Sequence, residues 1–274
     1  MTTGLAALAL ALLLIAASAF AQGVPASERE TILRLAADRG VAADDAGALL
    51  RPLDDAGAKG LPVAPLANKV REGLAKGVDP KRIDTVVRQM AGHLSTADAL
   101  IRELNLAAAP APDEPVVLLA DALAGGLSAD EVRELRRQAQ PAGAPPLPSD
   151  SLAGAAKGLS LIKSASLPPG EGTAVMVEAV RHGYRSQEML EVGRQVKRRE
   201  RDYRDGHASL RALREAIARG ERPEQIFTAT RAADVERPAA TRPDAATERP
   251  TRPARPEAPA RPARPERPER PQAR

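Results

Sequence analysis

The chain has 274 residues, a formal net charge of +4 and an isoelectric point of about 9.7. It contains no cysteine and no tryptophan, and only two tyrosines and two phenylalanines. The lack of cysteine excludes disulfides and thiolate sites for metals or redox chemistry. The scarcity of aromatic rings argues against a stacking platform for polysaccharide or single-stranded nucleic acid. A core must therefore be built from alanine, leucine, valine and isoleucine.

The first residues predict export. Residues 5–17 form an uncharged apolar run that is shorter than the roughly 20 residues of a membrane span. Ala19, Phe20 and Ala21 follow it in the small-x-small pattern of a signal-peptidase site, so we expect a signal peptide at 1–21 and a mature chain that begins at Gln22. An uncleaved N-terminal anchor is the alternative, because residues 1–4 contain no lysine or arginine. The short signal and the Ala- and Arg-rich composition suggest a bacterial protein of the periplasm or the medium, with no membrane span after cleavage.

A glycine frame repeats along the chain. In each copy an apolar residue lies seven positions before the glycine, a second lies three before it and a third lies six after it, as Val70, Leu74 and Ile83 do around Gly77. The four glycines of this frame are Gly77, Gly126, Gly183 and Gly220. Apolar residues three or four apart share one face of a helix, and a glycine just beyond them is the usual left-handed terminator. Each frame predicts a helix, a glycine turn and a new helix.

The apolar periodicity along the rest of the chain also predicts helices. Their expected ranges are 27–38, 44–57, 64–76, 80–91, 96–107, 114–125, 129–140, 149–165, 173–182, 186–205, 207–219 and 223–232. Ser128 with Glu131, and Ser27 with Glu30, have the spacing of capping boxes. Asp79 before Pro80 predicts a helix start. We expect an all-α fold, an irregular array of helical hairpins that is α-solenoid-like or a helical bundle, without the tetratricopeptide or ankyrin patterns.

Proline-rich breaks suggest the domain organisation. We expect an N-terminal helical repeat region at 22–140, a proline-rich linker at 141–148, a C-terminal helical region at 149–235 and a disordered tail at 236–274. The tail contains ten arginines, six acidic residues and ten prolines, so it accounts for the whole formal excess of +4. Dense proline removes amide donors and fixes φ, which predicts an extended, solvated segment.

The tail is also the sharpest functional suggestion in the sequence. Its arginines are spaced by proline, and guanidinium groups pair well with phosphate and carboxylate oxygens. The possible anion contacts are Arg252, Arg255, Arg261, Arg264, Arg267 and Arg270. These residues predict contact with an anionic polymer or lipid surface. The alternative is a solubilising spacer, because acidic residues are interleaved with the arginines.

Catalytic and metal-binding patterns are missing from the sequence. His93, His182 and His207 are far apart, and each lies near a glycine at a predicted helix end, where an imidazole can interact with the last carbonyls. The acidic pairs at 44–45 and 54–55 lack the spacing of a calcium loop. There is no Gly-x-Ser-x-Gly elbow and no phosphate loop, and residues 170–172 predict a turn before a helix. We therefore predict no catalytic residue, no metal site and no cofactor.

The most motif-like stretch is 63–90. Lys69, Glu72, Lys76 and Lys81 could form a docking surface on it. A purely structural interpretation is simpler: Glu72 pairs with Lys76, Gly73 allows a neighbouring helix to approach closely, and the glycine at 77 ends the helix.

Two functions remain open. The first is an exported, non-enzymatic helical scaffold or adaptor of the bacterial envelope that binds protein partners, with a tail that contacts anionic polymers and with no sequence-specific nucleic-acid binding. The alternative is an envelope enzyme, a cell-wall glycan hydrolase or lyase, with a carboxylate site assembled across helices. That enzyme would need a deep cleft and an acidic group of raised pKa.

Overall fold

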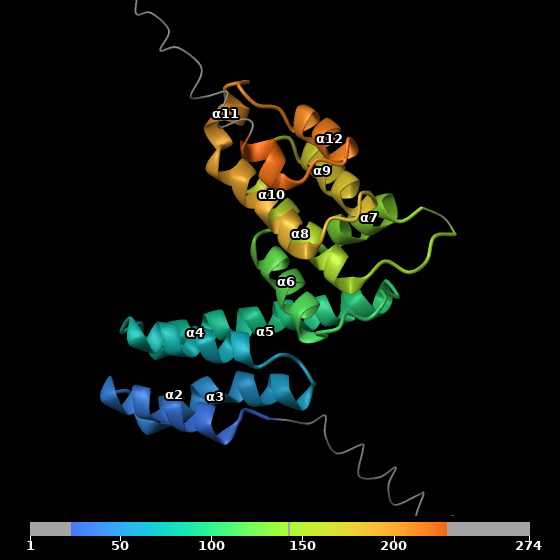
Figure 1. The fold of residues 1–274 in the computed structure, drawn as a ribbon. Helices are drawn as coiled ribbons and strands as arrows, with labels where there is room; N and C mark the ends of the chain where they lie inside the picture. The colour runs from blue at the N-terminus through green and yellow to red at the C-terminus, as the bar shows by residue number, and fades with distance from the viewer. Residues whose placement is uncertain (1–22, 142, 229–274) are drawn as a thin grey trace, which may run out of the picture. The chain divides into compact units, whose positions relative to one another are not determined.

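A computed structural model describes residues 23–141 and 143–228, and the first of its two compact units contains all of them (Figure 1). The predicted signal peptide and the tail at 236–274 lie outside the described residues, as do the six arginines proposed as anion contacts. Within the described ranges no β-strand occurs, which confirms the all-α prediction for this part of the chain. No described helix is both long enough and apolar enough to cross a membrane.

The described residues form a succession of helices joined by short turns. Their bounds are α2 Ala26–Asp38, α3 Ala43–Ala58, α4 Ala64–Ala75, α5 Pro80–Glu103, α6 Asp113–Ala124, α7 Ala129–Ala139, α8 Ser149–Lys163, α9 Pro169–Arg181, α10 Ser186–Arg198, α11 Glu200–Arg204 and α12 Leu210–Ala218, followed by a turn of helix at 223–228. Most of them agree with the predicted ranges to within a few residues, because the apolar periodicity marks the helix centres well.

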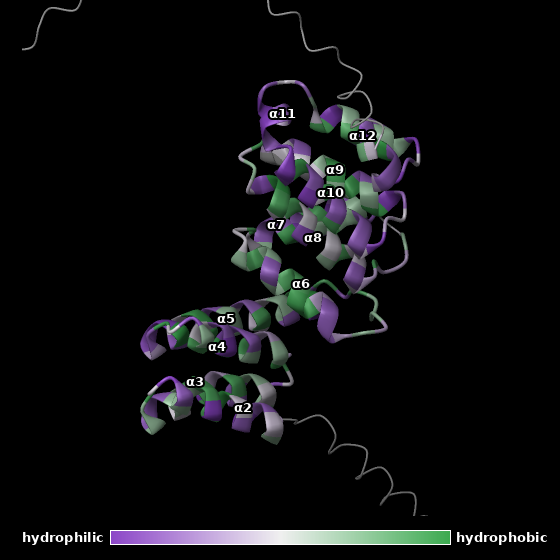
Figure 2. Ribbon diagram, turned by 60° about the vertical axis from the view of Figure 1, so that its left-hand side comes forward, coloured by the Kyte–Doolittle hydropathy of each residue, from purple (hydrophilic) through white to green (hydrophobic). Residues whose placement is uncertain are grey.

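The helices bury one continuous apolar core. Helix α8 packs against α6, α9 and α10, while α5 packs against α3, α4 and α6. Figure 2 shows apolar residues gathered on α6. Ala107, in the connection between α5 and α6, pairs with the end of the 141–148 segment and the start of α8, since Ala107 N–H donates to Leu147 O at 3.0 Å and Ser149 N–H donates to Ala107 O at 2.9 Å. The division into helical regions at 22–140 and 149–235 stays a prediction.

The repeated glycines take the left-handed conformation at the ends of their helices. Their φ angles are 66° at Gly77, 90° at Gly126, 65° at Gly183 and 83° at Gly220. In every case the next residue donates its N–H to a carbonyl five residues earlier, as Val78 does to Gly73 O at 3.0 Å. This bond is the signature of a Schellman turn, and it satisfies a carbonyl that the end of the helix leaves free.

We expect Gly77→Val to lower the free energy of unfolding by more than about 1 kcal/mol, because a β-branched residue fits positive φ badly. A Cβ at Gly77 would meet nothing within 4 Å, so the loss would come from backbone strain alone. Urea unfolding followed by circular dichroism measures the change. Gly77→Asn is the control, because asparagine tolerates this region and should cost less. Equal stability of the valine variant and the parent protein would contradict the prediction.

Three predictions of helix boundaries were wrong. The ranges 80–91 and 96–107 belong to the single helix α5, whose buried stripe runs through Met90, Leu94 and Ala97 without a break. Gly92 interrupts the pattern in the sequence only, because it lies on the exposed side of the helix. The range 186–205 divides at Arg199, which has φ −103° and ψ 24°, and the short α11 that follows buries no residue.

The third error lies at the start of α9. The predicted turn at 170–172 forms its first turn instead, and Gly172 lies so close to α8 that an added Cβ would stand 2.9 Å from Ile162 Cγ2.

The caps follow the predictions in part. Ser128 and Glu131 form the predicted capping box of α7, and Asp79 caps α5 by accepting the N–H of Lys81 at 2.9 Å. The capping box predicted at Ser27 was wrong, because α2 begins after Pro25 and has no side-chain cap.

Helices α8 and α10 cross with their backbones in contact. A Cβ built on Gly193 of α10 would lie 2.7 Å from Gly158 O, and one built on Gly154 would lie 2.6 Å from Ser186 Cα. These glycines replace the bulky side chains that usually separate packed helices. The crossing therefore depends on residues that have no side chain.

The tyrosine and phenylalanine rings of the described residues all lie in the C-terminal part of the chain, on Tyr184, Tyr203 and Phe227. Tyr184 follows the Gly183 turn, donates its hydroxyl hydrogen bond to Glu221 O, and has the Arg222 guanidinium 4.9 Å from its ring centroid. Burial raises the pKa of Tyr184 to about 12, against a smaller opposing effect of Arg222. Tyr184 thus ties the start of α10 to the turn after α12.

Candidate functional site

The histidines do not converge. His93 lies in the middle of α5, so its predicted place at a helix end was wrong. His182 is the C-cap of α9 and lies 3.0 Å from Glu178 through its Nε2, and His207 lies between α11 and α12. Among the described residues no group of three or more histidine, aspartate or glutamate side chains could hold a metal ion.

The acidic pairs at 44–45 and 54–55 both lie in α3, where their interactions are structural. Asp44 and Asp45 lie in the first turn of α3, where carboxylates interact favourably with the helix dipole. Asp54 forms an ion pair with Arg29 of α2 at 2.5 Å.

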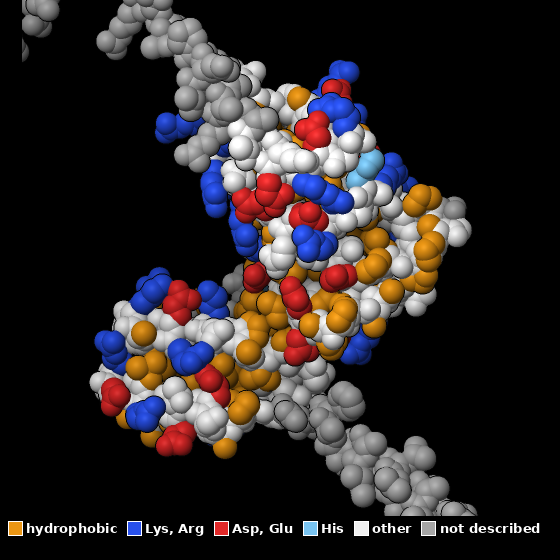
Figure 3. Space-filling model, in the orientation of Figure 1, with side chains coloured by type: hydrophobic (Ala, Val, Ile, Leu, Met, Phe, Trp, Pro, Cys, Tyr) orange, Lys and Arg blue, Asp and Glu red, His pale blue; other side chains and the backbone are white. Residues whose placement is uncertain are grey.

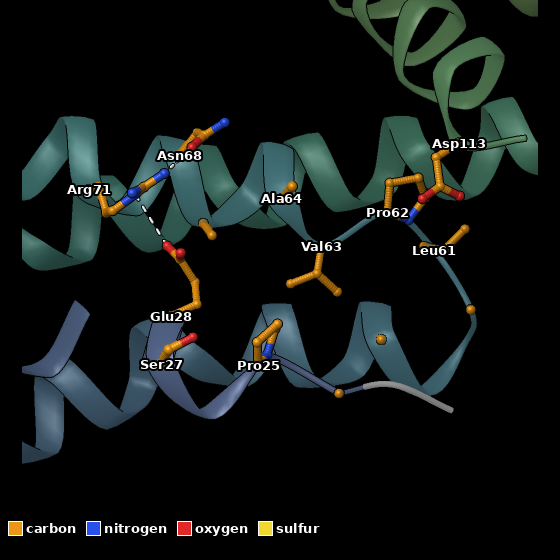
Figure 4. Close-up of a pocket in the computed structure, with 14 residues that line it drawn as sticks. Pro25, Ser27, Glu28, Leu61, Pro62, Val63, Ala64, Asn68, Arg71 and Asp113 are labelled. Atoms are coloured by element: carbon orange, nitrogen blue, oxygen red, sulfur yellow. Dashed lines mark hydrogen bonds and ion pairs between the residues drawn. The ribbon is translucent and has the colours of Figure 1, made fainter. Parts of the chain in front are cut away.

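A pocket of about 550 Å³ lies between α2 and α4 (Figure 4). Its apolar wall includes Leu61, Pro62 and Val63, which belong to the connection between α3 and α4. Glu28 and Arg71 meet at one end, with 3.2 Å between Oε1 and Nε, and Asp113 of α6 stands at the other end (Figure 4).

The polar groups of this pocket hold its walls together. Arg71 bridges α2 and α4, because it pairs with Glu28 and donates a hydrogen bond to Asn68. Glu28 Oε1 is buried and accepts no hydrogen bond in the described structure, so its contact with Arg71 is an ion pair without hydrogen-bond alignment. A carboxylate held by a guanidinium in this way is suited to positioning the two helices.

A second candidate site is a shallow hollow of about 370 Å³ on α4 and α5, here called the α4–α5 patch. Its lining residues are Lys69, Glu72, Gly73, Lys76, Val78, Arg82, Ile83 and Val86. Val78 is 36% exposed and Val86 is 49% exposed. Only one other large apolar residue among the described ones, Leu33, is comparably exposed. The patch thus combines an apolar centre with a charged rim.

The rim of the patch is mainly basic. Glu72 is its acidic member and pairs with Lys69 at 3.1 Å and with Lys76 at 2.5 Å. Arg82 forms no ion pair with any described residue, and neither does the neighbouring Lys81. Gly73 permits the close approach of α5, since a Cβ there would lie 2.6 Å from Ile83 Cγ1. The structural roles predicted for Glu72 and Gly73 are therefore confirmed, and free cations remain on the same surface.

We expect the Glu72 carboxyl group to titrate at a pKa of about 2, because Lys76 and then Lys69 stabilise its charged form. A lowered pKa in the folded state means that the stabilisation is present above the ordinary pKa of about 4.3 and is lost as the pH falls towards 2. Carboxyl ¹³C chemical shifts measured against pH test this. In a Lys69→Met, Lys76→Met variant the pKa should return towards its ordinary value. An unchanged pKa in that variant would contradict the assigned cause.

Sequence reasoning missed the exposed apolar centre of the patch, although Val78 and Val86 were visible in the stretch 63–90. Their exposure depends on the angle at which α4 meets α5, which no local pattern gives. Comparison of the chain with protein-family models, with curated proteins and with solved structures gave no match.

Proposed function

We propose that this protein is an exported, non-enzymatic helical scaffold of the bacterial envelope that binds a protein partner through the α4–α5 patch. The observation that carries the proposal is the pairing of exposed Val78 and Val86 with a basic rim. Apolar residues at the centre of a polar ring are the usual arrangement of a small protein interface. The partner should present an apolar side chain flanked by aspartate or glutamate, which would complement Lys81 and Arg82.

The distribution of charge outside the α4–α5 patch favours a partner that is recognised by the patch itself. On the face shown in Figure 3, basic and acidic side chains are interspersed. Beside the exposed valines of the patch, Lys81 and Arg82, which are unpaired among the described residues, can steer an acidic partner. In this proposal the tail arginines add contacts to anionic polymers of the envelope.

The alternative enzyme would need a carboxylic acid with a raised pKa. The pKa values of Glu72, Glu103, Glu134 and Glu200 are all lowered, chiefly by hydrogen bonds from neighbouring side chains. For Glu131, burial raises the pKa, but hydrogen bonds from Lys163 and Ser128 outweigh this effect and lower it. These shifts favour structural ion pairs over a general acid, so the scaffold is our preferred proposal.

Site-specific crosslinking tests the proposed interface. A photoreactive amino acid at position 86 of the full chain, expressed in its own host, should crosslink to one protein segment of acidic and apolar composition. The same amino acid in place of Leu33 is the matched control, because Leu33 is 39% exposed but lies on α2, outside the patch. Val86→Asp should abolish binding of the identified segment.

Other crosslinking results would count against the proposal. Identical crosslinks from both positions would indicate non-specific contact, and crosslinks only to a second copy of the chain would replace the partner with self-association.

The intact mass of the exported protein tests the compartment independently. A mass that starts at Gln22 is expected, whereas a mass that retains residues 1–21 would favour the N-terminal anchor.

A further inference from the structure

Four arginines from three helices line one cavity of about 630 Å³. Arg136 and Arg137 come from the last turn of α7, Arg181 comes from the last turn of α9, and Arg214 comes from α12. These residues are far apart in sequence, so the packing of α9 against α7 and α12 brings them together. The acidic residue in the lining is Glu178, which already contacts His182 at 3.0 Å.

The arginines of this cavity are only partly neutralised. Arg137 pairs with Glu134, and Arg181 donates to Gln138 O at 2.8 Å. Arg136 and Arg214 form no ion pair with any described residue. In addition, Arg136 Nε is buried and donates no hydrogen bond within the described structure. A buried donor without an acceptor is costly, and an incoming oxyanion would remove that cost if the side chain turned towards it.

The charge and the number of hydrogen-bond donors indicate the class of ligand. Glu134 and Glu178 each offset one of the arginines, and the carboxyl ends of α7 and α9 together contribute about one further negative charge, so an excess of about one positive charge remains. The four guanidinium groups also offer more N–H donors than the two oxygens of one carboxylate accept, which favours a phosphate group with its three acceptor oxygens. Guanidinium groups also bind phosphate oxygens in a bidentate manner. We propose that the cavity between α7, α9 and α12 is a binding site for a phosphate group.

Nitrogen-15 spectra of the arginine Nε–H groups in the full chain test this site with inorganic phosphate as the probe. Titration at constant ionic strength should shift the Arg136 signal, identified by its loss in Arg136→Lys, and the shift should saturate. Acetate should give no saturable shift at the same concentrations. Arg214→Gln should weaken phosphate binding about tenfold, as expected for the loss of a charge-assisted hydrogen bond.

The matched control is Arg211→Gln, which removes an arginine from the same helix. Arg211 lies outside the cavity and pairs with Glu215 at 3.0 Å, so its loss should leave phosphate binding unchanged. Both variants keep the arginines of the tail, so the difference between them reports the cavity. Circular dichroism verifies that both remain folded, and Arg136→Lys gives a second test because lysine cannot bind in a bidentate manner.

A second arm separates the sources of the phosphate group. Co-sedimentation with vesicles of phosphatidic acid and phosphatidylcholine that is weakened by Arg214→Gln, and not by Arg211→Gln, would assign the site to a lipid headgroup. Binding of inorganic phosphate without that difference would assign it to free phosphate. The absence of a saturable shift of Arg136, or equal weakening by both glutamine variants, would overturn the proposal.

Discussion

Gly193→Ala should lower the free energy of unfolding by about 2 kcal/mol, although alanine is the better helix former. The added methyl group would stand 2.7 Å from Gly158 O and 2.9 Å from Gly158 Cα, so it meets backbone atoms that no rotamer change can move. Overpacking of this kind costs about 1–3 kcal/mol, and the gain in helix propensity of up to about 1 kcal/mol offsets only part of it. Urea unfolding followed by far-ultraviolet circular dichroism gives the change.

The control for this substitution is Gly92→Ala, which should have the opposite sign. Gly92 lies inside α5, and a Cβ there would meet nothing within 4 Å. Only the higher helix propensity of alanine then acts, so the free energy of unfolding of this variant should rise by about 0.5–1 kcal/mol. If Gly193→Ala also stabilised the protein, the close crossing of α8 and α10 would be wrong.

Leu119→Ala should lower the free energy of unfolding by more than Gly193→Ala does, by about 2–5 kcal/mol. Leu119 is 1% exposed on α6, the helix that packs against both α5 and α8. Removing its side chain leaves a cavity in the core that the surrounding residues can fill only in part. Chemical unfolding of the purified chain measures the loss.

Leu118→Ala is the matched control, since Leu118 is the next residue on the same helix and is only partly buried. It should cost clearly less than Leu119→Ala. Equal losses would show that the burial assigned to α6 is wrong. The number of transitions in the same experiment tests the division at 141–148, because independently folding regions would unfold in separate steps.

The fold was predictable from the sequence where a short local pattern determines the structure. The full glycine frame, with apolar residues seven and three positions before the glycine and six after it, as around Gly77, marks both the end of a helix and its Schellman bond. The continuity of α5 across Gly92 was not predictable in the same way. Whether a glycine ends a helix or sits on its exposed side depends on what the following residues bury, and Leu94 is buried by other helices.

The contacts between distant segments needed the structure. The spacing of Gly154 and Gly158, four residues apart, is a recognisable signal for a close helix crossing, but it does not identify α10 as the partner. The arginine cavity had no local signal at all. Arg136, Arg181 and Arg214 are ordinary helix-surface residues in the sequence, and only the packing of three helices joins them.

The restriction of Tyr184, Tyr203 and Phe227 to the C-terminal part of the described chain has a practical consequence for all of these experiments. Because the described part of the chain has no aromatic ring before Tyr184, intrinsic tyrosine fluorescence observes α10 to α12 and their surroundings, whereas far-ultraviolet circular dichroism observes every helix. The natural sequence thus carries a regional reporter without any label. Coincident curves from the two signals would show that α2 to α6 unfold together with the tyrosine-bearing end, and separated curves would show the order in which the two ends come apart.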